Sequence, residues 1–219
     1  PGKPRVTPEE IDLLVWWIEQ GLPDSAMGVL KPPARIEQTA NARLSEKQRQ
    51  LLLETARAEA ERFERELAEL RAALPGSLRF VTAGRQELEY TPGAGAARFD
   101  DAALKKLAPV ASRLVMLDLS RTSISSRGLL ELGDLPALLR LDLANTSVDD
   151  QAFSGLAAPV LASLNLSGTK ITDAGLERIV FPPSLRRVYL AGTAVSPAGV
   201  EKLRSRLPGV DIQYNLPTP

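Results

Sequence analysis

Four segments in the C-terminal half of this 219-residue chain share one pattern of apolar residues. Each follows L-x-x-[LV]-x-L-x-x-T-x-[IV], and the segments begin at Leu114, Leu138, Leu161 and Leu185, which are 24, 23 and 24 residues apart. Self-similarity at a period of this length is typical of proteins in which one structural unit stacks on the next and buries a continuous core. The repetition therefore predicts a solenoid from about Leu114 to Tyr214.

Each repeat predicts one strand and one helix. Alternating leucines form a short strand that points them into the core, and the residues between them face the concave surface. The apolar spacing that follows, as in residues 171–179, predicts a helix on the convex side. The fold class is therefore α/β, with about four regular repeats.

The regular repeats are flanked by less regular segments. Residues 99–107 match the convex helical pattern, so we expect one degenerate repeat before Leu114, with Leu88 and Tyr90 in its strand. Residues 91–97 are then a glycine-rich insertion, because the glycine spacing and the lysine of a phosphate-binding loop are missing there. The alternation of residues 210–214 predicts a closing strand.

Residues 45–76 are predicted to form a long capping-helix region. Its helix begins at a capping box at Ser45 and ends at Leu74, before Pro75-Gly76. Its apolar residues recur three and four apart, at Leu53, Ala56, Ala60, Phe63, Leu67, Leu70 and Leu74. We expect this stripe to pack on a neighbouring element of the same chain and to cap the N-terminal end of the solenoid. A self-associating coiled coil, giving a dimer in place of a monomer, is the alternative.

The chain is predicted to have four regions. Residues 1–22 form an amphipathic helix with Thr7 as N-cap, Pro8 at its first position and Gly21 as its stop. Residues 23–44 are rich in Pro, Gly and small side chains and predict a linker. The capping helix over 45–76 and the repeat domain over 77–219 follow. Because the chain begins Pro1-Gly2 without methionine, we expect it to be a fragment or a processed product.

Composition excludes several classes of function. Lys+Arg and Asp+Glu both number 27, so no net charge attracts nucleic acid, and no long apolar stretch predicts membrane contact. Cysteine and histidine are absent, which removes disulfides, thiol nucleophiles and the commonest general base. We therefore expect a protein that is not an enzyme.

The repeats, from Leu114 to about Leu207, resemble the leucine-rich repeats common in planctomycete and verrucomicrobial proteins. This resemblance implies a protein-interaction scaffold that binds a protein partner through its concave face. It does not identify the partner.

The segment Pro1–Gly21 is similar to the end of the planctomycete-type c-type cytochrome domain. This resemblance implies an alternative function, as the accessory region of a haem-c electron-transfer protein on the periplasmic side of a bacterial membrane. A c-type site requires C-x-x-C-H, so we expect no cofactor in this chain and haem c only in an upstream domain. Trp16 and Trp17 are then a remnant of haem-domain packing or part of a buried amphipathic helix.

Two sets of repeated polar residues are candidates for function. A threonine follows each strand, and a hydroxyl there is expected to satisfy backbone groups at the turn; catalysis by threonine has no accompanying base. These positions are Thr122, Thr146, Thr169 and Thr193.

The second set faces the concave surface. Strands lie about 4.8 Å apart, which puts Asp118 beside Asp142. The pair is either an acid/base or cation site or, as we favour, a solvated ladder partly neutralised by Arg140. Since Tyr and Arg dominate interface energetics, the candidate binding residues are Arg140, Arg187, Tyr189, Asp118, Asp142 and Asn165, and no metal site is expected.

Overall fold

The computed structural model describes residues 46–81, 87–155 and 157–214. The chain divides into two compact units, residues 1–64 and 65–219. The described part of the first unit is the N-terminal portion of α3 (Glu46–Ala73), whose last turns belong to the second unit. The helix over 1–22 and the linker over 23–44 lie outside the described residues, so they and the resemblance to a cytochrome domain stay predictions.

Helix α3 buries its apolar stripe only near its C-terminal end. In the first unit Ala56 and Ala60 are exposed. In the second unit Leu67 and Leu74 are buried, and the Arg71 Nε–H donates to the carbonyl of Leu78 at 2.8 Å. Packing of the stripe on this chain is therefore seen at Leu67 and Leu74, and the capping of the solenoid by this helix stays a prediction.

The sheet of the second unit has seven strands in the order of the chain. Strands β1 and β2 are antiparallel, and every later pair is parallel. Such a sheet is compatible with a solenoid, because each parallel strand needs a crossover to reach the next. The strands are β1 (Ser77–Phe80), β2 (Leu88–Thr91), β3 (Leu114–Asp118), β4 (Arg140–Asp142), β5 (Ser163–Asn165), β6 (Arg187–Tyr189) and β7 (Asp211–Gln213).

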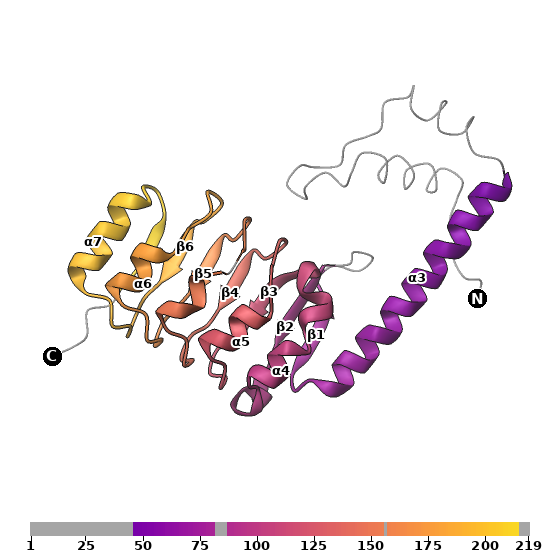
Figure 1. Cartoon of the computed structure of the whole chain (residues 1–219), viewed down its shortest axis with the longest axis horizontal. Helices are drawn as coiled ribbons and strands as arrows, with labels where there is room; N and C mark the ends of the chain where they lie inside the picture. Colours follow the sequence, from indigo (N-terminus) through magenta and orange to yellow (C-terminus); the bar gives the residue numbers. More distant parts are fainter. Residues whose placement is uncertain (1–45, 82–86, 156, 215–219) are drawn as a thin grey trace, which may run out of the picture. The chain divides into compact units, whose positions relative to one another are not determined.

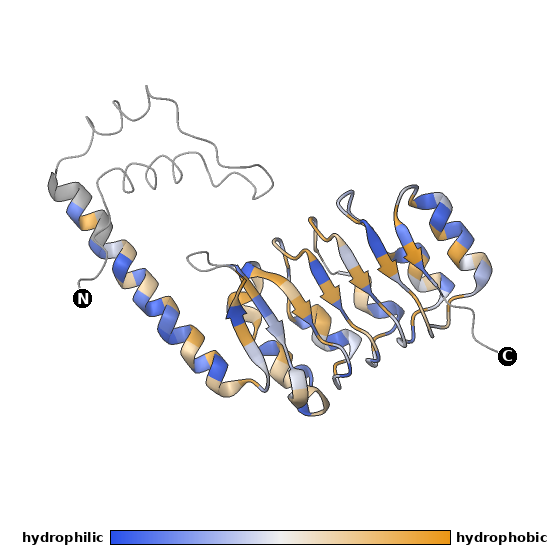
Figure 2. Ribbon diagram, turned by 180° about the vertical axis from the view of Figure 1, so that it is seen from behind, coloured by the Kyte–Doolittle hydropathy of each residue, from blue (hydrophilic) through white to orange (hydrophobic). Residues whose placement is uncertain are grey.

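Helices lie on one face of this sheet, and the other face is bare (Figures 1 and 2). The helical elements are η1 (Gly93–Arg98), α4 (Asp101–Lys105), η2 (Ala108–Arg113), α5 (Ser126–Glu131), η3 (Asp150–Phe153), α6 (Asp173–Arg178) and α7 (Pro197–Arg206). Two predictions need correction. Residues 93–98 of the predicted glycine-rich insertion form a 3-10 helix in place of a bulging loop, and the convex segment at 150–153 is a 3-10 helix in place of an α-helix.

The core lies between the sheet and the helices. Leu117, Leu141, Leu164 and Val188 occupy the same strand position and are at most 2% exposed. Their neighbours along each strand point to the bare face, as the period of two requires. Buried and less buried residues therefore alternate along the strands, and the ribbon changes between hydrophobic and hydrophilic colours within them (Figure 2).

The four strands from β3 to β6 each end in a turn of one kind. The residue before each repeat threonine has a positive φ, at Arg121, Asn145, Gly168 and Gly192. The threonine hydroxyl then donates to the carbonyl three residues earlier. These bonds join Thr122 to Leu119 at 2.6 Å, Thr146 to Leu143 at 2.7 Å, Thr169 to Leu166 at 2.6 Å and Thr193 to Leu190 at 2.8 Å.

A second series of hydrogen bonds joins the helix starts of neighbouring repeats, and we call it the N-cap ladder. The Asp150 carboxylate accepts both the N–H and the hydroxyl of Thr172, at 2.8 and 2.7 Å. Asp101 holds Ser125 in the same way, and Asp173 holds Ser196. The ladder consists of Asp101, Ser125, Gly128, Ser126, Asp149, Ala152, Asp150, Thr172, Gly175, Asp173, Ser196 and Gly199.

The glycines of the N-cap ladder leave space for these carboxylates. A Cβ at Gly128, Gly175 or Gly199 would meet the aspartate of the preceding repeat at 2.1, 2.0 and 2.1 Å. In one repeat Ser126 takes the place of the aspartate. Its hydroxyl donates to Asp149 at 2.6 Å, and the residue three positions after Asp149 is Ala152 in place of glycine. Glycine therefore occurs where the preceding repeat supplies an aspartate, and the larger alanine occurs where the preceding repeat supplies a serine.

Candidate binding site on the concave face

Strand register sorts the side chains of the bare face into two rows. One row joins Glu89, Met116, Arg140, Ser163, Arg187 and Asp211. The other joins Asp118, Asp142, Asn165, Tyr189 and Gln213. From β3 to β6 the rows agree with the register predicted from the repeats, because the distance between strands in the sequence is nearly constant.

A depression with a volume of about 460 Å³ lies in this face. Its lining includes five of the six predicted residues, which we call the concave cluster: Asp118, Arg140, Asp142, Asn165 and Tyr189. Arg187 does not line it. The depression also includes Arg79, Glu89 and Thr91 from β1 and β2, which were not predicted from the sequence. The alternation of Leu88 and Tyr90 was the signal that could have placed Glu89 and Thr91 on the same face.

The two carboxylates of the concave cluster are held by neutral donors. Asp118 accepts the Ser120 N–H at 2.9 Å and the Thr91 hydroxyl at 3.1 Å. Asp142 accepts the Ala144 N–H at 2.9 Å and the side-chain amide of Asn165 at 2.9 Å. These bonds orient the carboxylates, and their charge is not cancelled by a cation.

Arg140 forms no ion pair with Asp118 or Asp142 in the described residues, so its partial neutralisation of the pair stays a prediction. The Arg140 side chain is exposed and makes no ion pair with any residue in the described ranges. It shares a strand with Asp142, two residues away, so the two side chains lie in different rows. Within the same ranges there is also no group of three or more acidic, His or Cys side chains suited to a metal ion.

The charges at the two ends of the face are neutralised within the chain. Arg79 pairs with Glu89 between β1 and β2. At the other end the Arg187 Nε lies 3.2 Å from Asp211 Oδ2 on β7. The neighbouring Tyr189 hydroxyl and the Asp211 carboxylate raise the pKa of Arg187. Arg187 therefore already has a carboxylate partner within the chain.

Tyr90 forms part of the floor of the depression. It is buried, its ring lies 5.1 Å from that of Phe99, and its hydroxyl donates to the carbonyl of Pro75. Burial, and then the charge of Asp118, raise the pKa of the Tyr90 phenol. Tyr90 is thus a neutral hydrogen-bond donor in the floor of the depression.

Comparison with known families supports a leucine-rich-repeat protein. A leucine-rich-repeat model matches residues 158–180, which span β5 and α6 and include Thr169. No curated protein matches the chain. Among the described helices, none is both long and apolar enough to span a membrane. The repeat class and the seven-stranded sheet together indicate a scaffold for protein interaction.

Proposed function

We propose that this chain is a protein-interaction scaffold without catalytic activity, and that it binds its partner through the concave cluster. One contrast carries the proposal. Arg79 and Arg187 have carboxylate partners at the ends of the face, whereas Arg140 at its centre has none in the described part of the chain. Charges without an internal counter-ion are available to a partner that supplies complementary ones.

The layout of the concave cluster suggests how a partner segment binds to it. Arg140 and Asp142 are two residues apart, so their rows are separated by about 6.6 Å along the strand. An extended segment crossing the strands would pair an acidic side chain with Arg140 and a basic one with Asp118 and Asp142. Tyr189, half-buried beside them, supplies the aromatic contact that interfaces favour.

Charge reversal tests this proposal. The whole chain is used to capture partners from an extract of its native host, and bound proteins are quantified for the wild type, Arg140→Glu and Asp142→Lys. Arg127→Glu on α5, an exposed arginine on the helical side, is the matched control. We expect each concave substitution to weaken capture about tenfold or more and the control to retain it. Equal capture by all four proteins would exclude the concave cluster as the binding surface.

A further inference from the structure

The loop between α6 and β6 exposes apolar side chains on the surface. Val180 is 91% exposed, more than any other large apolar side chain in the described part of the chain. The residues after it and those following α7 surround a second depression of about 430 Å³. Its apolar lining is Phe181, Pro182, Pro183, Leu185, Leu207, Pro208 and Val210.

The fold does not require Val180 and Phe181 to be apolar. In both this loop and the one after α5, a backbone N–H bonds to the carbonyl three residues earlier, from Leu185 to Pro182 at 3.0 Å and from Leu138 to Leu135 at 3.1 Å. When the two loops are aligned on these bonds, Gly133-Asp134 in the loop after α5 corresponds to Val180-Phe181. A small and a polar residue therefore suffice for the turn, and Val180 contributes almost nothing to the core.

Basic side chains accompany the second depression. The Arg206 guanidinium lies 5.9 Å from the Phe181 ring centre and donates to the carbonyls of Leu176 and Ile179. Arg186 donates through one nitrogen to the carbonyls of Pro183 and Leu185, which leaves other N–H groups for a ligand.

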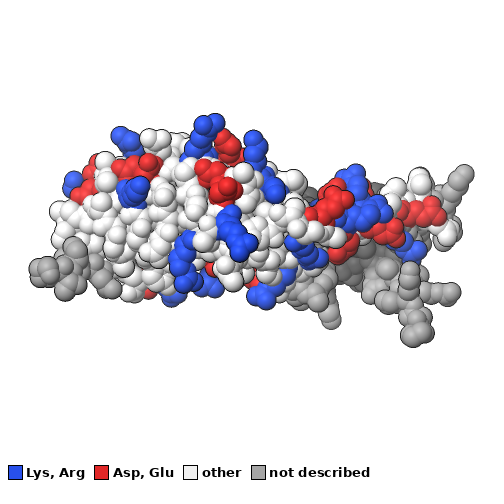
Figure 3. Space-filling view, turned by 90° about the horizontal axis from the view of Figure 1, so that it is seen from below, with Lys and Arg blue, Asp and Glu red and all other residues white. Residues whose placement is uncertain are grey.

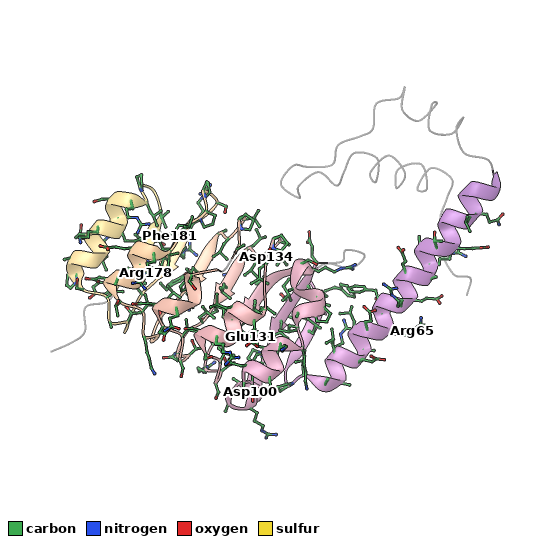
Figure 4. All side chains as sticks on the ribbon, viewed as in Figure 1. Arg65, Asp100, Glu131, Asp134, Arg178 and Phe181 are labelled. Carbon is green, nitrogen blue, oxygen red and sulfur yellow. The ribbon has the colours of Figure 1, made fainter. Side chains whose placement is uncertain are left out.

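Nearby carboxylates do not cancel these positive charges. Glu177 lies 3.3 Å from Lys202, and Glu201 lies 2.7 Å from Arg204. Neither Arg186 nor Arg206 has a carboxylate partner among the described residues, and the same holds for Arg178, at the end of α6 near Phe181 (Figure 4). On the face seen in Figure 3, charges of both signs are interspersed. An apolar depression with uncompensated positive charge is thus a local feature.

We propose that this surface, the α6–α7 loop patch (Arg178, Val180, Phe181, Arg186 and Arg206), binds an acidic segment of a partner protein. An apolar side chain of that segment enters the depression beside Val180 and Phe181. Carboxylates on either side of it pair with Arg178 and Arg186, since guanidinium and carboxylate form two parallel hydrogen bonds. This site is separate from the concave cluster and shares no residue with it.

Fluorescence anisotropy of the whole chain with two labelled peptides tests the proposal. One is acetyl-Glu-Glu-Leu-Phe-Glu-Glu-amide, and the other has lysine in place of glutamate. We expect the acidic peptide to bind, the lysine peptide not to bind, and Val180→Asp or Arg186→Glu to weaken binding about tenfold or more. Arg127→Glu, at an exposed arginine on α5 outside both proposed surfaces, should leave it unchanged. No binding of the acidic peptide, or equal binding of both, overturns the proposal.

Two further measurements separate peptide binding from loss of folding and from binding to a membrane. Because Val180 is exposed, Val180→Asp should unfold at the same temperature as the wild type; with folding intact, unchanged affinity for the acidic peptide would overturn the proposal. Sedimentation with phosphatidylcholine vesicles, with and without phosphatidylserine, tests an anionic membrane as the ligand. Binding only to the phosphatidylserine vesicles and not to the peptide also overturns it. Loss of peptide binding in Arg140→Glu would instead assign the acidic segment to the concave cluster.

Discussion

The N-cap ladder and the concave cluster run along the same solenoid at the same interval, and both contain aspartates held by neutral donors. In the N-cap ladder the space beside each aspartate is closed, because glycines such as Gly175 sit where a Cβ would be 2.0 Å from the carboxylate. In the concave cluster Asp118 and Asp142 border a depression of about 460 Å³. An aspartate therefore stabilises the fold where the neighbouring repeat fills the space around its carboxylate. Where that space is open, the carboxylate can bind a ligand.

The two sets also differ in what they join. Asp101, Asp150 and Asp173 of the N-cap ladder each bond twice to one residue of the next repeat, so they carry stability between repeats. The concave cluster contains Arg140, whose guanidinium bonds to nothing in the described residues. Substitutions should therefore lower the free energy of unfolding in the ladder, and affect binding with little loss of stability in the cluster.

Gly175→Ala should have the largest effect. Its Cβ would displace the Asp150 carboxylate and break both bonds to Thr172. We expect the free energy of unfolding, measured by urea denaturation, to fall by about 2–4 kcal/mol, because hydrogen bonds to charged groups contribute about 1.5–3 kcal/mol each. Arg140→Ala should change it by less than about 0.5 kcal/mol.

A triple substitution is the control for this prediction. Asp150→Ser with Thr172→Asp and Gly175→Ala reproduces the arrangement of Ser126, Asp149 and Ala152 in the preceding repeat. It should recover most of the lost stability, since the hydroxyl and the alanine then fit together. A triple variant less stable than Gly175→Ala would mean that the steric match between repeats is not the cause.

Acid should weaken the N-cap ladder by a smaller amount. Hydrogen bonds from Ser196 lower the pKa of Asp173, and hydrogen bonds from Ser126 and Gln151 lower that of Asp149. A carboxyl whose folded-state pKa is lowered contributes stability above its unfolded value of about 3.9, and this contribution is lost as pH falls through the folded-state pKa.

Thermal unfolding between neutral pH and pH 2 measures this effect. Both carboxylates are near solvent, so each should contribute at most about 1 kcal/mol. The wild type should lose stability below about pH 4, and Asp173→Asn should show a shallower loss. An identical pH profile for the two proteins would mean that the bonds of Asp173 contribute no net stability.

How much could be predicted depends on how regular each segment is. The strands from β3 to β6 and their shared rows follow from leucines at a fixed period, because a one-residue slip would turn every leucine to the wrong face. The positions of Glu89 and Thr91 did not follow, since β2 belongs to an irregular repeat and its neighbour β1 is antiparallel. The pairing of Arg187 with Asp211 depends on the register of the last strand, beyond the regular pattern.

The N-cap ladder was only half visible in the sequence. Each regular repeat has Ser, Thr or Asp at the start of its convex helix and Gly or Ala three residues later. The bonds that account for it connect Asp150 to Thr172 and Gly175, which lie one repeat apart. A pattern read within one repeat cannot distinguish a glycine that permits a turn from one that makes room for a neighbour's carboxylate.

The smallest expected effect lies at the turn between the two sets, at Arg121. Its φ is 59°, in the left-handed region that costs an ordinary residue about 1–2 kcal/mol, and Gly168 and Gly192 occupy the same place in later repeats. Arg121→Gly removes this strain but gives the unfolded chain more freedom, so the free energy of unfolding, measured by urea denaturation, should rise by about 0.5 kcal/mol.

Gly192→Ala tests the strain alone, because its Cβ would approach no described atom closer than 3.7 Å. Gly168→Ala would also place a Cβ 2.3 Å from Asn145 Oδ1. The loss should therefore be larger at Gly168 than at Gly192. Equal losses at both would show that contact between repeats matters less at this turn than in the N-cap ladder.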